Sequence, residues 1–412
     1  MSKAFIKWIK LRFERVVTSI AFYPVIIATC YLLLSVLMVA FDFSETGKDL
    51  KSDLDWVRLK DASTARSIIS AIAAGIISLT VFSFSMVMIV LNQAASQMSN
   101  RVLDNLIGNR FQQVILGIYI GTIVYSLFLL STIRDIDSGI YIPAISIYLL
   151  IVLTIVDIFL FIYFLHYITQ SVKYETIIHR IYEKTLASMK SSCRLDEEPV
   201  KQVEGLEKVN GQVLYTPDTG IYQGIDKDGL LNVCNSEDLL IKLLHAPGTF
   251  LTEGTAYAVT SKKIDDNLES RIRLMVNIHR GDAIDSSYYN GIRQLVEVAI
   301  KALSPGINDP GTAISSLRAL ASILIYRLKH FPDTVIKDDE GKLRIITTER
   351  SAEEIVEYSL LPIWDYGKED RLLRNELRML VEQLSKFTAS PILKKLAHEV
   401  HMANTRDAIV PA

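Results

Sequence analysis

Small and polar side chains recur through an uncharged segment, residues 67–100, at a spacing of three or four residues. That spacing places them on one face of a helix. Small residues allow helices to approach closely, whereas polar groups also suit a pore in which Phe82 and Ile89 form apolar constrictions. Helix packing and pore lining therefore both remain open for this face. It comprises Ser67, Gly75, Ser78, Phe82, Ser85, Ile89, Asn92, Ser96 and Ser99.

One acidic residue, Asp157, interrupts a second apolar segment, residues 140–167. A carboxylate inside a membrane is costly and normally faces a cavity or a polar partner. The position therefore suits an ion site, a proton relay or a polar pair with another helix, or else a hydrated place near one membrane face. His166, nine residues later, is typical of the membrane interface and not of a metal ligand.

A third set of polar residues surrounds the sequence Ser304-Pro-Gly-Ile-Asn-Asp-Pro310. Asp309 directly before Pro310 predicts a helix N-cap followed by the first helical residue. Caps and turns account for such residues, and ligand binding is the alternative. The motif residues are Arg293, Gln294, Ser304, Pro305, Asn308, Asp309 and Pro310, and Asp282, Asp285 and Glu297 lie in the same stretch of sequence.

Several kinds of chemistry lack a motif in this sequence. Neither the P-loop pattern nor the dinucleotide glycine pattern occurs. His398 and His401 are three residues apart, whereas the helical zinc-protease motif needs a spacing of four. Three cysteines, Cys30, Cys193 and Cys234, suggest neither a disulfide scaffold nor a zinc site. We therefore expect no enzymatic activity, no cofactor and no metal.

The distribution of charge divides the chain into two parts. Of 412 residues, 50% are hydrophobic and 22% are charged. Residues 1–170 contain 13 Lys and Arg and 11 Asp and Glu, which leaves 31 and 35 for the remainder. The first part therefore has the composition of a membrane domain and the second that of a soluble domain. A net charge of −2 gives no indication of nucleic-acid binding.

Four segments of the first part are long and apolar enough to span a bilayer, which takes about 20 residues of helix. They are residues 16–41, 68–91, 111–133 and 140–167. Lys and Arg accumulate before the first segment and, at Arg101 and Arg110, between the second and third. Since basic loops stay in the cytoplasm, we expect cytoplasmic N- and C-termini. In the third segment, Gly117 and Gly121 predict close helix packing.

The second part has a mixed pattern of short strands and helices. We expect a helical stalk over 170–189, a linker over 191–210, and strands over 212–216, 220–225, 248–251, 255–259 and 271–278. Ser236 is expected to cap a short helix that ends near residue 244. A hairpin is expected over 332–347, and helices over 286–303, 312–329, 351–358, 369–387 and 391–403.

Three stretches of the sequence resemble one family. They are Gly291-Ile-Arg-Gln-Leu-Val-Glu-Val-Ala-Ile-Lys-Ala-Leu-Ser-Pro-Gly-Ile-Asn-Asp-Pro-Gly-Thr-Ala313, residues 92–103 and residues 116–125, with Tyr163-Phe-Leu-His166 as a shorter match. Together they resemble a bacterial membrane-protein family known as domain of unknown function 2254. The resemblance implies a multi-pass protein of the bacterial inner membrane and implies no activity. Asp157 is not part of the family pattern.

The expected architecture is a four-helix transmembrane domain (residues 1–170), a juxtamembrane stalk and linker (171–210), a β-rich cytoplasmic subdomain (211–280) and a helical cytoplasmic subdomain (281–412). In fold class it is a membrane α-helical protein with an α+β cytoplasmic domain. One hypothesis is a homo-oligomeric ion channel or transport pathway, lined by the second span and regulated by the cytoplasmic domain. The other is a membrane-anchored sensor or scaffold that binds a small ligand or a protein partner. A second-span face buried inside one bundle favours the scaffold, and a face open between subunits favours the channel.

Overall fold

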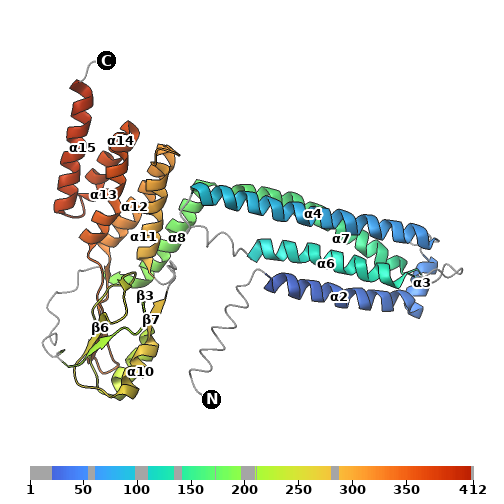
Figure 1. Ribbon diagram of the computed structural model, residues 1–412, viewed down its shortest axis with the longest axis horizontal. Helices are drawn as coiled ribbons and strands as arrows, with labels where there is room; N and C mark the ends of the chain where they lie inside the picture. The colour runs from blue at the N-terminus through green and yellow to red at the C-terminus, as the bar shows by residue number, and fades with distance from the viewer. Residues whose placement is uncertain are drawn as a thin grey trace. The chain divides into compact units, whose positions relative to one another are not determined.

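The computed structural model describes residues 21–53, 61–97, 110–133, 142–171, 173–195, 209, 211–279 and 287–409. Ser99, Asp282 and Asp285 lie outside these ranges, as do the basic residues before the first span. The chain forms two compact units whose main division lies between Lys173 and Tyr174. We call them the membrane unit and the C-terminal unit, and each is described by itself (Figure 1).

Four helices of the membrane unit are long and apolar enough to cross a bilayer, which confirms the expected spans. They are α2 (Phe22–Phe43), α4 (Ala62–Gln97), α6 (Arg110–Thr132) and α7 (Ala144–Ser171), and the short α3 (Glu45–Asp53) follows α2. Figure 1 shows the four long helices running side by side. Two buried apolar clusters hold them together, one around Tyr125 and Leu129 and the other around Tyr119 and Phe164.

The predicted close approach at the two glycines of α6 is confirmed. A Cβ atom on Gly117 would lie 2.7 Å from Ile27 Cδ1, and one on Gly121 would lie 2.7 Å from Tyr31 Cγ. Any larger residue would therefore push α2 away from α6, because carbon atoms in contact are about 3.5–4.0 Å apart. The glycines bring Tyr31 of α2 into the interior of the bundle.

A buried carboxylate joins the end of α2 to the start of α7. Asp42 is fully buried and accepts hydrogen bonds from the backbone N–H groups of Ile145 and Ser146, at 3.2 and 2.8 Å, and from the Ser146 hydroxyl. The first N–H groups of a helix have no partner within the helix, and the helix dipole favours an anion there. Asp42, on α2, therefore holds the N-terminal end of α7 in place. The sequence pattern does not predict this contact.

The described part of the C-terminal unit contains six longer helices, α8 (Tyr174–Ser192), α11 (Tyr288–Ala302), α12 (Pro310–Lys329), α13 (Ala352–Gly367), α14 (Arg371–Leu384) and α15 (Pro391–Ile409). The stalk is therefore a separate helix, since α7 ends at Ser171. Gly291 of α11 faces Thr185 of α8 so closely that a Cβ atom there would overlap the threonine side chain. Helix α13 continues through Pro362, beyond the expected end at residue 358.

The described strands of the C-terminal unit form three small sheets. Their strand orders are β2-β6-β4-β10-β9, β5-β3-β7 and β1-β8. Strand β10 runs parallel to β4 and antiparallel to β9, so the predicted hairpin exists and joins the sheet of the β-rich segment. The strands are β1 (Cys193–Leu195), β2 (Val213–Tyr215), β3 (Gly220–Ile225), β4 (Ile241–Leu243), β5 (Phe250–Leu251), β6 (Ala256–Thr260), β7 (Val276–His279), β8 (Phe331–Pro332), β9 (Val335–Lys337) and β10 (Leu343–Ile346).

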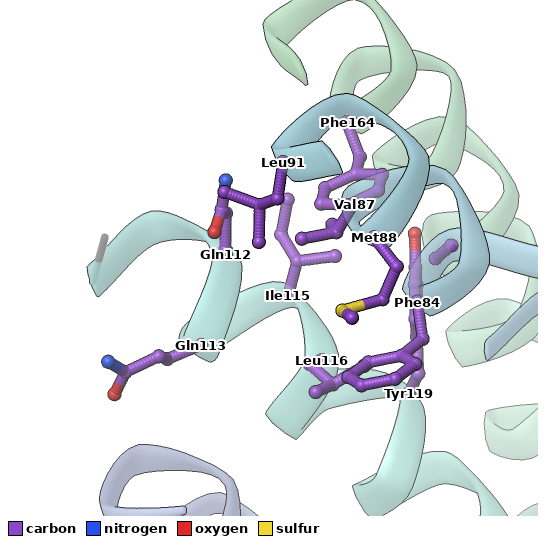
Figure 2. A pocket seen from close by; sticks show the side chains of 11 residues that line it. Phe84, Val87, Met88, Leu91, Gln112, Gln113, Ile115, Leu116, Tyr119 and Phe164 are labelled. Atoms are coloured by element: carbon purple, nitrogen blue, oxygen red, sulfur yellow. The ribbon is translucent and has the colours of Figure 1, made fainter. Parts of the chain in front are cut away.

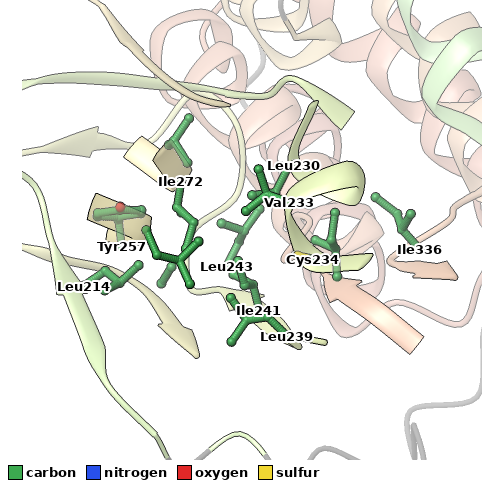
Figure 3. Packing of buried hydrophobic residues seen from close by; sticks show 14 of the residues in the cluster. Leu214, Leu230, Val233, Cys234, Leu239, Ile241, Leu243, Tyr257, Ile272 and Ile336 are labelled. Atoms are coloured by element: carbon green, nitrogen blue, oxygen red, sulfur yellow. The ribbon is translucent and has the colours of Figure 1, made fainter. Parts of the chain in front are cut away.

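Apolar side chains from the five-stranded and three-stranded sheets form one core with two short helices, α9 (Lys227–Ser236) and α10 (Asp266–Met275). Leu230 and Cys234 of α9 and Ile272 of α10 pack into this core beside Ile241 and Leu243 of β4 (Figure 3). All five side chains are buried. The core therefore fixes both helices against the sheet.

The prediction of a helix that begins at Ser236 is wrong, because α9 ends at that residue. Its actual N-cap is Asp226, which accepts a hydrogen bond from Gly229 N at 3.1 Å. The next buried residues are Leu239, Ile241 and Leu243, each exposed by no more than 1%. A period of two residues is typical of a strand, and this alternation explains why the segment forms β4.

The prediction of a strand over residues 271–278 is also largely wrong. Helix α10 occupies most of it, and β7 begins only at Val276. Asp265 caps α10 by accepting a hydrogen bond from Leu268 N at 2.8 Å. Leu268 and Ile272 are buried at a spacing of four residues, which is the helical period.

Candidate functional site

The polar face of α4 points away from the chain's own bundle. Its described side chains are all exposed, and a Cβ atom on Gly75 would meet nothing within 4 Å. The opposite side of α4 is buried, through Ala65, Ile69, Ile76 and Ser83. Packing inside one bundle therefore does not explain the face. The exposed residues are Ser67, Gly75, Ser78, Phe82, Ser85, Ile89 and Asn92, whereas the side chain of Ser96 and the whole of Ser99 lie outside the described part.

From Gly75 onward the polar face repeats every seven residues. Ser78, Ser85 and Asn92 form one row at this spacing, and Gly75, Phe82 and Ile89 form the adjacent row. A seven-residue repeat allows helices to wind around one another in a left-handed bundle. Large apolar residues occupy a different exposed strip, which consists of Ile77, Val81, Phe84 and Met88.

Two residues of the polar face, Phe82 and Ser85, also make contacts within their own chain. The Phe82 ring is 54% exposed, yet it also packs edge-on against Phe161 of α7, with the ring centroids 5.8 Å apart. The Ser85 hydroxyl donates to the Val81 carbonyl at 2.8 Å, within its own helix. Phe82 is therefore partly anchored in its own chain, and Ser85 needs no partner from outside.

A second candidate site lies inside the membrane unit, around Asp157. This residue is fully buried near the middle of α7, and neither carboxylate oxygen has a hydrogen-bond partner among the described residues. Its electrostatic neighbours are neutral hydroxyl groups, from Tyr31 of α2 and from Tyr119 and Thr122 of α6. The cluster therefore contains no described cation that could balance an ionised carboxylate.

Ser83 brings the fourth helix to this site. It lies on α4, it is 2% exposed, and its hydroxyl neighbours the Tyr119 hydroxyl. Both oxygen atoms, Ser83 Oγ and Tyr119 Oη, lack a hydrogen-bond partner within the described structure. Buried polar atoms usually have partners, so this cluster of hydroxyls and one carboxyl requires an explanation beyond packing.

A cavity of about 140 Å³ adjoins the cluster between α4 and α6 (Figure 2). Ser83 and Tyr119 form part of its wall, and Gln112 and Gln113 lie at its edge. Apart from Phe164 of α7, its lining residues belong to the second half of α4 and the first half of α6. The remaining lining is apolar and consists of Phe84, Val87, Met88, Leu91, Ile115, Leu116 and Phe164.

In the C-terminal unit, the predicted cap at the helix break is confirmed. Asp309 accepts hydrogen bonds from Thr312 N at 3.1 Å and from the Thr312 hydroxyl at 2.6 Å, and Pro310 is the first residue of α12. Asn308 before it has a φ of 48°, a left-handed conformation that asparagine tolerates better than most residues. Ser304 donates its hydroxyl to the Lys301 carbonyl at 2.7 Å. The motif residues of this loop thus perform turn chemistry.

The two motif residues on α11 have a different environment from the loop. Gln294 is 1% exposed, and its side-chain oxygen has no hydrogen-bond partner in the described part of the chain. Arg293 is half-buried, whereas Pro305 and Asn308 are exposed. The residues of α11 are therefore more buried than Pro305 and Asn308 of the loop.

A buried polar cluster that sequence reasoning missed joins α11 to the segment after β10. Tyr288 donates a hydrogen bond to Glu349 Oε2 at 3.4 Å, and the guanidinium group of Arg350 lies 4.0 Å from the centroid of the Tyr289 ring. Burial raises the pKa of Glu349 to about 7, although Arg327, Tyr288 and Arg350 act in the opposite direction. The residues of this cluster are about 60 positions apart in sequence, and only the fold brings them together.

Metal and thiol chemistry receive no structural support in the described residues. No group of three or more His, Cys, Asp and Glu side chains there could hold a metal ion. His398 and His401 are exposed on α15, and His166 is exposed on α7. Burial raises the pKa of Cys193 to about 11 and that of Cys234 to about 12, so neither is a reactive thiolate at neutral pH.

Comparison with known proteins gives a family but no activity. The chain is 26% identical over 339 residues to the uncharacterized protein Mb1321c of Mycobacterium bovis and to the uncharacterized protein Rv1290c of Mycobacterium tuberculosis. The match covers 79% of this chain and 65% of each relative, so the chain matches slightly less than two thirds of their length. No solved structure matches it significantly. A family model described as predicted membrane protein (DUF2254) matches residues 17–383, and the chain belongs to that family.

Proposed function

We propose that this chain forms a homo-oligomeric channel or transport pathway whose wall is the polar face of α4. The observation that carries the proposal is the exposure of every described side chain of that face. Hydrocarbon offers no hydrogen-bond partners, so polar groups such as the Asn92 amide are costly against lipid. Water or another subunit satisfies such groups better than lipid does.

The division of the exposed surface of α4 supports the same assembly. The strip that contains Ile77 and Val81 is apolar and suits contact with lipid, whereas the row of Ser78, Ser85 and Asn92 is polar. Several α4 helices packed at a seven-residue repeat would bring these polar rows together around one axis. Phe82 and Ile89 would then form apolar rings, and a narrow apolar ring resists wetting when the pathway is closed.

The remaining parts of the proposal concern placement and regulation. Lys and Arg near the spans support cytoplasmic N- and C-termini in a bacterial inner membrane. The C-terminal unit follows α7 directly in the chain, since α8 begins at Tyr174. It therefore is in a position to transmit a ligand or protein signal to the spans, and we assign it a regulatory role. Lipid, ions or a small solute, and identical subunits are the expected partners, and nucleic acid is not.

The alternative function, a membrane-anchored sensor or scaffold, is supported by the hydroxyl of Ser85. That hydroxyl bonds to its own backbone, so this part of the face can pack dry against another subunit. In such an assembly α4 would hold subunits together without enclosing water. The two functions differ in the presence of an aqueous path.

Cysteine cross-linking tests whether α4 lies at a subunit contact. Cys30 is exposed and is first replaced by alanine, whereas Cys193 and Cys234 are buried. We expect Ser78→Cys and Ser85→Cys to give disulfide-linked dimers on mild oxidation in membranes. Ile77→Cys, on the apolar strip of the same helix, serves as the matched control. Equal cross-linking at all three positions, or none at Ser78 and Ser85, would contradict the proposed assembly.

A further inference from the structure

We infer that Asp157 is a proton-binding site inside the membrane unit, reached from the cavity between α4 and α6 through the hydroxyl groups of Tyr119 and Ser83. The inference uses only contacts and burial within a single chain. It therefore does not depend on the oligomeric pathway proposed above, although a proton site inside the bundle would be compatible with one.

The first step of the argument is the position of the carboxyl group. Asp157 lies 13 residues after the first residue of α7, Ala144, and 14 before the last, Ser171. At a rise of about 1.5 Å per residue, it is roughly 20 Å from either end of the helix. It is fully buried and has no hydrogen-bond partner among the described residues. An ionised carboxylate in that environment is strongly disfavoured against the neutral acid.

The second step concerns the groups that face Asp157 from the neighbouring helices. Helix α2 contributes Tyr31, and α6 contributes Tyr119 and Thr122. Helix α4 contributes Ser83, beside the Tyr119 hydroxyl. The titratable groups among them are phenols, which are neutral near pH 7. No described group therefore compensates a negative charge, whereas hydroxyl oxygens can accept a hydrogen bond from a protonated carboxyl group.

The third step distinguishes a proton from a metal cation. A cation such as Ca²⁺ needs six to eight oxygen ligands at 2.3–2.6 Å, which places those oxygens close to one another. Neither carboxylate oxygen has a hydrogen-bond partner among the described residues, and the Thr122 hydroxyl already donates to the Ile118 carbonyl at 3.2 Å. The neutral oxygens therefore do not form a coordination cage around the carboxylate. A proton needs only the carboxyl group itself.

The fourth step is the route by which the proton arrives. The cavity of about 140 Å³ is large enough for a few water molecules, since each occupies about 30 Å³ in liquid water. Ser83 and Tyr119, in its wall, offer unpaired oxygens that a water molecule could bond. Tyr119 also neighbours Asp157. A hydronium ion that enters the cavity can give a proton to the Tyr119 oxygen while the phenol releases its own proton, through a bridging water, to the carboxylate. The hydronium ion becomes a neutral water, the phenol stays neutral, and the carboxylate becomes the neutral acid.

Infrared spectroscopy and carbodiimide labelling of the full chain in lipid test the site. In a Glu349→Gln background, which removes the other carboxyl group that titrates near pH 7, we expect at pH 7 the carbonyl band of a protonated carboxylic acid, and Asp157→Asn should abolish it. A lipid-soluble carbodiimide, which adds to protonated carboxyl groups, should modify the Asp157 peptide in the unaltered chain. Asp42 is the internal control, because its carboxyl oxygens already accept three hydrogen bonds and it should stay unmodified.

The route is tested by hydrogen–deuterium exchange of the same band. Tyr119→Phe should slow the exchange, whereas Tyr125→Phe should leave its rate unchanged. Tyr125 is an apt control because it is also buried on α6, yet its hydroxyl donates to the Ser146 carbonyl at 3.2 Å. An unlabelled Asp157 in the unaltered chain, or a band that persists in Asp157→Asn, would overturn the proton site. Equal exchange rates in the two tyrosine variants would overturn the route.

Discussion

Two buried aspartates of the membrane unit show how local surroundings decide what a carboxyl group does. Asp42 accepts three hydrogen bonds at the start of α7, which makes it a structural link between helices. Asp157 lies within the same bundle and has no such donors among the described residues. The residue type is the same, and only the donors within reach differ. Sequence indicated the depth of Asp157 but gave no sign of the role of Asp42.

Glu349 gives a pH-dependent prediction at the residue scale. Burial raises its folded pKa from 4.5 to about 7, so the folded protein binds more protons than the unfolded chain between these values. Stability therefore falls as pH rises through the window from about 4.5 to 7, by up to about 3 kcal/mol. Thermal melts of the full protein at pH 5 and pH 8 measure this loss.

Glu349→Gln is the matched variant for that prediction, because it keeps the shape of the side chain and removes its titration. We expect the difference between the two melting temperatures to shrink in this variant. A difference as large as that of the unaltered protein would show that another group controls the pH dependence.

Asp309 carries the second prediction, at the start of α12. Asp309→Ala removes two hydrogen bonds to Thr312 and should lower stability by about 0.5–2 kcal/mol. Asp309→Asn keeps an acceptor at the cap and should recover most of the loss. Chemical denaturation of the full protein in detergent provides the measurement. An alanine variant as stable as the parent would mean that the cap does not hold this turn.

At the scale of elements, one glycine sets how closely two helices approach. A Cβ atom on Gly291 would overlap the side chain of Thr185, so Gly291→Ala should separate α11 from α8 and cost about 1–3 kcal/mol. Gly306→Ala is the control, since a Cβ atom there meets nothing within 4 Å. The melting temperatures of the two variants are compared. Equal values would show that the close approach of α11 and α8 does not require glycine at position 291.

The elements also show what the sequence could and could not predict. Long apolar runs, one of them interrupted by Asp157, predicted all four spans, because few other structures tolerate such composition. Asp309 before Pro310 predicted its cap, since the capping signal is local. Ser236 resembled a cap as well, but the alternating burial of Leu239, Ile241 and Leu243 made that segment a strand. Where local sequence signals favour different structures, packing in the tertiary core determines which structure forms.

The candidate sites were predictable only where one helix contains them. The polar face of α4 could be read from its spacing, whereas its exposure required the bundle. The cluster around Asp157 combines residues from all four spans, and the contact between Tyr288 and Glu349 joins positions 61 apart in sequence. Spacing along the chain gives no information about such pairs. Their detection needs the packed structure.

At the scale of the whole molecule, the proposed topology is tested by labelling intact cells. With Cys30 replaced by alanine, single cysteines are introduced as Glu45→Cys and Ser192→Cys, both at exposed positions. We expect a membrane-impermeant thiol reagent to label position 45 and not position 192, because basic residues keep the N-terminus and the second loop inside. Labelling of position 192 alone would reverse the orientation.

The central claim, an aqueous path lined by α4, is tested most directly by conductance across bilayers that contain the purified protein. Phe82→Ser should hydrate the proposed apolar ring and raise basal conductance, whereas Phe82→Leu keeps the ring apolar and should change it little. Phe82 also contacts Phe161, so a thermal melt of each variant shows whether the bundle stays folded. A folded serine variant that raises the current supports the channel. A folded serine variant that conducts no ions contradicts it and favours the anchored sensor.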